Sequence, residues 1–130
     1  MGLIDRAFGA DKNTMLQHSL ALHWRMVASH HENYIKKNEM TQEQKQIFSE
    51  IQERSLKIAE LANSAIKGFG IVSPEVSDFK AELAKLTLLK EKIEVRTDKQ
   101  HWLPEAIYAT TCILNGDKRR YQRENLWFSH

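Results

Sequence analysis

The strongest constraint on the fold is the spacing of apolar and small residues between Thr41 and Phe69. These residues recur in steps of three and four, at Phe48, Ile51, Ser55, Ile58, Ala62, Ala65 and Phe69. Such spacing places them on one stripe of an α-helix, and flanking apolar residues make the stripe wide enough to face a core. The sequence therefore predicts that the rest of the chain covers this helix.

The sequence also carries signals for the start and the end of this helix. Thr41 with Gln44 three residues later has the pattern of a capping box. Gly68 and Gly70 predict the end of the helix, because glycine readily adopts the left-handed conformation found there. The outer face carries two acid–base pairs in the favourable order, Glu50 with Arg54 and Glu53 with Lys57.

A preceding helix is predicted from Asp11 to about Lys37. One face carries Leu16, Leu20, Trp24, Val27, His31 and either Tyr34 or Ile35. Met15, Leu22 and Met26 lie off that face, which indicates contact with more than one neighbour or with a second chain. The short connection at 38–40 predicts that the two helices run antiparallel.

Four of the six histidines fall in this first helix, at His18, His23, His30 and His31. Helical metal sites use ligands three or four residues apart. His18 and His23 are five residues apart, and no acidic residue stands three or four positions before any of the four. The pattern favours rim, core or interface histidines over a metal site, and no cofactor is predicted.

Two further helices are predicted. Ser73 caps and Pro74 begins the third, which runs to about Val95 with Phe79, Leu83 and Leu86 in its buried stripe. Its charged face is expected to be solvated: Lys80, Glu82, Lys85, Glu91 and Lys92. A shorter, mostly buried helix follows from Pro104 to Leu114, ended by Asn115 and Gly116.

The predicted fold class is all-α. The chain of 130 residues reads as one domain, with three long antiparallel helices and a shorter fourth in an up-and-down bundle. The alternative is a three-helix core with an irregular C-terminal cap. Strand signals are nearly absent; Ile71–Val72 is one of two briefly extended stretches.

The composition limits the classes of protein to which this chain can belong. The formal net charge of +2 is too small to indicate nucleic acid by itself. A single cysteine, Cys112, excludes an internal disulfide framework. The longest mostly apolar run, 106–114, is far shorter than the roughly 20 residues of a membrane span, and no secretion signal is recognised. These features predict a soluble, cytoplasmic protein.

Both ends of the chain carry distinct segments. Residues 1–10 are predicted to form a short amphipathic arm that docks on the bundle, with Leu3, Ile4, Ala7 and Phe8 on one side. The alternative is an anchor to a membrane surface or to a partner. Residues 117–130 combine basic and aromatic side chains, which suit a protein interface or a nucleic-acid surface. The candidate partner-binding residues there are Arg119, Arg120, Tyr121, Arg123, Trp127 and Phe128. The alternative is that the aromatic residues dock on the bundle while the arginines stay in water.

No phosphate-binding glycine loop, nucleophile elbow or paired-carboxylate motif is recognised, so no enzyme is predicted. The leading hypothesis is a non-catalytic adaptor or regulator that binds a protein and associates with itself. The self-association surface is predicted at Met15, Leu22, His23, Met26 and His30, and the homodimer is expected to loosen as pH falls. The alternatives are a nucleic-acid-binding regulator that uses the C-terminal segment and a small metalloprotein that uses the histidines.

Overall fold

The structure is a computed structural model that describes residues 12–72 and 76–124. Within these residues it is mostly helical, which confirms the predicted all-α class. The helices are α2 (Lys12–Lys37), α3 (Gln42–Ala65), α4 (Val76–Glu91), α5 (Trp102–Leu114) and α6 (Lys118–Glu124). Two short antiparallel strands, β1 (Ile66–Gly68) and β2 (Ile71–Val72), join α3 to α4. The predicted N-terminal arm lies outside the described residues.

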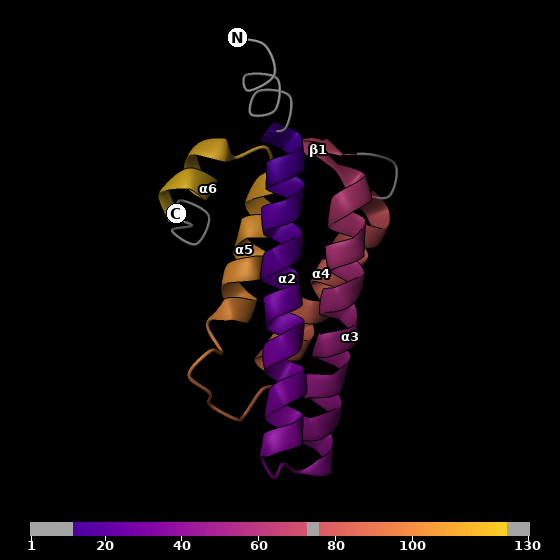
Figure 1. The fold of residues 1–130 in the computed structure, drawn as a ribbon, viewed down its shortest axis with the longest axis vertical. Coiled ribbons are helices and arrows are strands. Elements are labelled where there is room, and N and C mark those ends of the chain that lie inside the picture. The colour runs from indigo at the N-terminus through magenta and orange to yellow at the C-terminus, as the bar shows by residue number, and fades with distance from the viewer. Residues whose placement is uncertain (1–11, 73–75, 125–130) are drawn as a thin grey trace.

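The helices pack around a shared interior. The α2 and α3 helices run side by side in opposite directions and make the most extensive contact in the molecule. The α4 helix packs on α3, and α5 packs on both α2 and α4. Figure 1 shows the short α6 turning back beside α5, at the end of the bundle where α2 begins.

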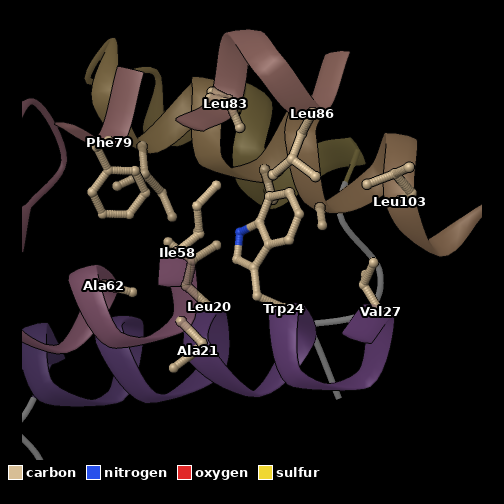
Figure 2. Close-up of a cluster of buried hydrophobic side chains, with 14 of the residues drawn as sticks. Leu20, Ala21, Trp24, Val27, Ile58, Ala62, Phe79, Leu83, Leu86 and Leu103 are labelled. Carbon is tan, nitrogen blue, oxygen red and sulfur yellow. The ribbon is translucent and has the colours of Figure 1, made fainter. Parts of the chain in front are cut away.

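The core is centred on Trp24. Figure 2 shows its indole ring among aliphatic side chains from four helices, with Leu20 and Val27 from its own helix beside it. The indole Nε1 donates a hydrogen bond to Thr110 Oγ1 at 2.9 Å, and Thr110 Oγ1 donates to the carbonyl of Ala106 at 2.7 Å. The one polar atom of this large side chain is therefore satisfied inside the core, as burial requires.

The α3 helix begins as predicted but ends earlier. Thr41 Oγ1 accepts the backbone N–H of Gln44 at 3.2 Å, which is half of the predicted capping box. The predicted end at Phe69 is wrong, because Ile66 is already extended and begins β1. The side chain of Gln17 in α2 donates to the Ile66 carbonyl, so a contact from another helix holds the chain at this point.

Two glycines allow the turn after β1 to touch the end of α5. Gly70 and Gly116 both have positive φ, at 73° and 74°. A Cβ on Gly70 would lie 3.2 Å from the Cα of Gly116, and the Gly70 N–H donates to the Ile113 carbonyl at 2.7 Å. Gly70 therefore combines a backbone conformation that favours glycine with a tight approach of Gly116, whereas at Gly116 the positive φ alone favours glycine.

The α4 helix is shorter than predicted. It ends at Glu91 rather than near Val95, and an irregular connection of residues 92–101 follows. The side chain of Gln44 explains this, since its Nε2 donates to the Lys92 carbonyl at 3.2 Å and its Oε1 accepts the Glu94 N–H at 3.0 Å. Gln44 thus binds backbone groups of another segment instead of completing the capping box.

The prediction that Glu82 faces water is wrong. Glu82 is buried between α3 and α4, where Arg54 Nη1 donates to Oε2 at 2.8 Å and Lys57 Nζ donates to Oε1 at 3.1 Å. Burial alone would raise the pKa of Glu82, but the hydrogen bonds and charges of Arg54 and Lys57 outweigh it and lower the pKa. The carboxylate therefore stays ionised and links the two helices.

We expect Glu82→Gln to lower the free energy of unfolding by about 2 kcal/mol, because it leaves two cations without their buried counter-charge. The matched control is Glu53→Gln on the exposed side of α3, with an expected change within about 0.5 kcal/mol. Urea denaturation of both variants measures the difference. Equal midpoints for Glu82→Gln and the wild type would contradict the assigned role.

Candidate functional site

The outer side of α2 carries exposed apolar side chains. Met15 is 54% exposed and Leu22 is 50% exposed, and Met26 is partly buried. The three positions recur after seven and four residues, so they share one face of the helix, opposite the face that holds Trp24. Three members of the predicted self-association surface therefore lie together on the outside.

The other two members of that predicted surface lie elsewhere. His23 is fully buried, and His30 is half-buried against the connection between α4 and α5. Both histidines contact residues at or next to this connection, since His30 is hydrogen-bonded to Thr97 and His23 to the backbone of Trp102. Their helical phase differs from that of Met15 and Leu22. His18 is the one histidine of α2 whose side chain is exposed.

His30 joins α2 to the middle of the connection. Its Nε2 is hydrogen-bonded to Thr97 Oγ1 at 2.8 Å, and its ring meets that of Trp102 edge to face, with 6.1 Å between centroids. Burial lowers the pKa of His30 below its ordinary value, Asp98 opposes the shift, and Lys99 and His101 add to it. The neutral imidazole is therefore the form that this contact favours.

His23 and His31 are held inside the structure. Burial lowers the pKa of His23 to about 4, although a hydrogen bond with the backbone of Trp102 acts in the opposite direction. Burial also lowers the pKa of His31 to about 4, while its hydrogen bond of 2.7 Å between Nδ1 and the Val27 carbonyl opposes the shift. His31 packs on Phe48 with ring centroids 4.8 Å apart. Both histidines are core residues that are neutral at pH 7.

The histidines do not assemble into a metal centre. Across residues 12–72 and 76–124, no group of three or more histidine, cysteine, aspartate or glutamate side chains is placed to hold a metal ion. Cys112, the one cysteine of the chain, is buried in α5. The arrangement around α2 therefore offers hydrogen bonding and proton uptake as its chemistry.

In the described part of the C-terminal segment, Tyr121 docks on the bundle and the two arginines before it are exposed. Tyr121 is buried, and its ring meets Phe69 edge to face with 5.1 Å between centroids. Burial raises the pKa of the Tyr121 hydroxyl. Arg119 and Arg120 are exposed, and the N–H of Arg120 donates to Asp117 Oδ1 at 3.1 Å. Because Tyr121 is buried, it does not contribute its ring to a surface formed by Arg119 and Arg120.

Three predicted partner-binding residues cannot be placed on this surface. Arg123 lies within α6, but its side chain is outside the described part of the structure. Trp127 and Phe128 also lie outside the described residues. The described surface of α6 is therefore basic, with Lys118, Arg119 and Arg120 exposed.

Sequence reasoning missed the residues opposite the histidines. Thr97, His101 and Trp102 come together with His23 and His30 only through the connection between α4 and α5. The one available signal was the change from a periodic helix to a polar stretch with a tryptophan before Pro104. That signal locates a loop, but it does not identify the helix on which the loop lies.

Comparisons with protein-family models, curated proteins and solved structures find no match for this chain. A search of the described helices for a bilayer-spanning segment finds none of sufficient length and apolar character. Any functional assignment therefore depends on the surfaces and contacts described above.

Proposed function

We propose that the chain is a non-catalytic protein-interaction module, an adaptor or regulator, that associates with a second copy of itself. The observation that carries the proposal is the outer face of α2, where Met15 and Leu22 are each at least half exposed. Large apolar side chains that share an exposed helix face are typical of interaction surfaces. Methionine also adapts to irregular contacts, as an interface between two identical faces requires.

We propose that the chain is one cytoplasmic domain, folded as an up-and-down bundle of three long helices and a shorter fourth. The pairwise contacts among α2, α3, α4 and α5 support this arrangement. His23 and His30 are no longer part of the proposed interface, because both face the connection within the same chain.

We expect the wild-type chain to form a dimer that Leu22→Glu weakens at least about tenfold, since a two-fold interface brings the two new carboxylates together. Leu88→Glu is the matched control, because Leu88 is a leucine on α4 that is 62% exposed. Sedimentation velocity from about 1 to 100 µM measures the association, a range that brackets a micromolar Kd. A wild-type monomer throughout, or equal association of both variants, would contradict the proposal.

The second candidate is a nucleic-acid-binding regulator, favoured by exposed Lys118, Arg119 and Arg120 on α6. Burial of Tyr121 leaves this surface with phosphate-binding charges and one fewer aromatic side chain for base stacking. Adding a mixed-sequence oligonucleotide to the same sedimentation experiment distinguishes the two. A complex that dissociates steeply as salt rises, without self-association, would favour this candidate.

A further inference from the structure

The connection between α4 and α5, residues 92–101, lies beside the lower half of α2, where Figure 1 shows it as an open loop. The side chain of Gln44 holds its first residues through the carbonyl of Lys92 and the N–H of Glu94. Its middle is held by the hydrogen bond of 2.8 Å between Thr97 Oγ1 and His30. Side chains of two different helices therefore attach this connection to the bundle.

Ile93 packs against the hydrophobic core, but the residues that follow it in the connection are mostly polar and exposed. Its charged side chains are exposed at Glu94, Arg96, Asp98 and Lys99. It borders a hollow of about 480 Å³ lined by its own residues Ile93, Glu94, Val95, Arg96, Thr97 and Gln100. A segment with few buried apolar contacts opens at a lower free energy than the helices beside it.

We infer that residues 95–101 form an acid-released strap, which His30 latches to α2 at neutral pH and which detaches locally when His30 takes up a proton. The inference concerns contacts within one chain and is independent of the proposed self-association. Detachment would uncover His30 and the ring of Trp102, while Gln44 would keep residues 92–94 in place.

The groups around His30 determine the direction of this effect. From the strap, Lys99 and His101 disfavour its protonated form and Asp98 favours it. From α2, His31 and Tyr34 contact its ring, with centroids at 5.1 and 6.2 Å. Lys99 Nζ also lies over the Trp102 ring at 5.2 Å, so positive charge already occupies the strap beside the imidazole. Burial, Lys99 and His101 therefore disfavour the protonated form of His30, and Asp98 favours it.

The size of the effect follows from proton linkage. His30 has a lowered pKa when the strap is closed and regains an ordinary pKa of 6.5 when the strap is open. Such a group stabilises the closed form fully above pH 6.5, and this stabilisation is lost as pH falls below that value. Between pH 7.5 and 5.5 the opening constant should rise by up to about tenfold for this one histidine.

Amide hydrogen exchange followed by NMR tests the inference, with rates corrected for the intrinsic effect of pH. The reporters are the amides of Thr97 and Trp102, which bond to Gln100 Oε1 and the Lys99 carbonyl. We expect their opening constants to rise, by up to about tenfold from pH 7.5 to 5.5, while remaining far above that of the core amide Ile51 in α3. Opening constants equal to that of Ile51 would show global unfolding and overturn the inference.

Three variants assign the effect to the latch. His30→Gln should abolish the pH dependence at Thr97, whereas His18→Gln, at an exposed position of the same helix, should preserve it. Thr97→Val removes the hydrogen bond but keeps the histidine, so it should open the strap about three- to tenfold more at neutral pH. Retention of the pH dependence in His30→Gln, or unchanged opening in Thr97→Val, would each overturn the inference.

Discussion

Lowering the pH from 7 to 4 is expected to remove about 6 kcal/mol from the free energy of unfolding, because His23 and His31 are buried as neutral imidazoles. The pKa of each falls from 6.5 to about 4 in the folded chain. A lowered histidine pKa gives stability that is complete above pH 6.5 and is lost as pH falls toward 4. Each histidine accounts for about 3 kcal/mol of the loss.

Urea denaturation at a series of pH values from 7.5 to 4 measures this loss. Because small domains are stable by only about 5–15 kcal/mol, unfolding without denaturant should begin above pH 4. His31→Phe should roughly halve the pH dependence, since Phe can pack against Phe48 without taking up a proton. The exposed His18→Gln serves as the control and should follow the wild type. A denaturation midpoint that stays constant between pH 6.5 and 4.5 would contradict the assignment of buried neutral histidines.

Trp24→Ala is expected to lower the free energy of unfolding by about 4 kcal/mol, because it leaves a large cavity among four helices. Trp24→Phe should lower it by about 2 kcal/mol, since it keeps an aromatic ring but loses the hydrogen bond to Thr110. Thr110 Oγ1 still donates to the Ala106 carbonyl in this variant, so the hydroxyl keeps a partner.

Urea denaturation of these variants at pH 7.5 gives the comparison. Leu88→Ala removes a large side chain from an exposed position of α4, outside the proposed interface, and should change stability by no more than about 0.5 kcal/mol. The urea midpoint should be highest for Leu88→Ala, lower for Trp24→Phe and lowest for Trp24→Ala. If Trp24→Ala unfolded at the wild-type midpoint, Trp24 would not be the centre of the core.

The sequence by itself determined which residues form the core-facing sides of the helices. The stripe at Phe48, Ile51, Ser55 and Ile58 is buried, and so is the stripe at Leu20, Trp24 and Val27. The start of α3 at Thr41 was equally clear. These features depend on residues within one or two turns of each other, so the helical period and the capping chemistry are enough to predict them.

Other features were decided by contacts between distant segments. Gln44 reaches Lys92, which is 48 residues away, and it ends α4 early instead of closing its own capping box. Arg54 and Lys57 turn toward Glu82 in α4, so a residue with the pattern of a solvated face is buried. In each case a side chain could satisfy a local partner or a distant one, and only the packing of the helices determined which partner was within reach.

The candidate sites also combine features that the local sequence pattern predicts with features that depend on distant contacts. Met15 and Leu22 were predicted to lie off the core-facing stripe of α2, and both are exposed, because their helical phase is opposite to that of Trp24. The partner of His30 could not be predicted, since Thr97 is 67 residues away in a segment without periodicity. The sequence determined which side chains α2 presents in each direction. The tertiary structure alone decided what lies opposite them, because that depends on the path of the chain between helices.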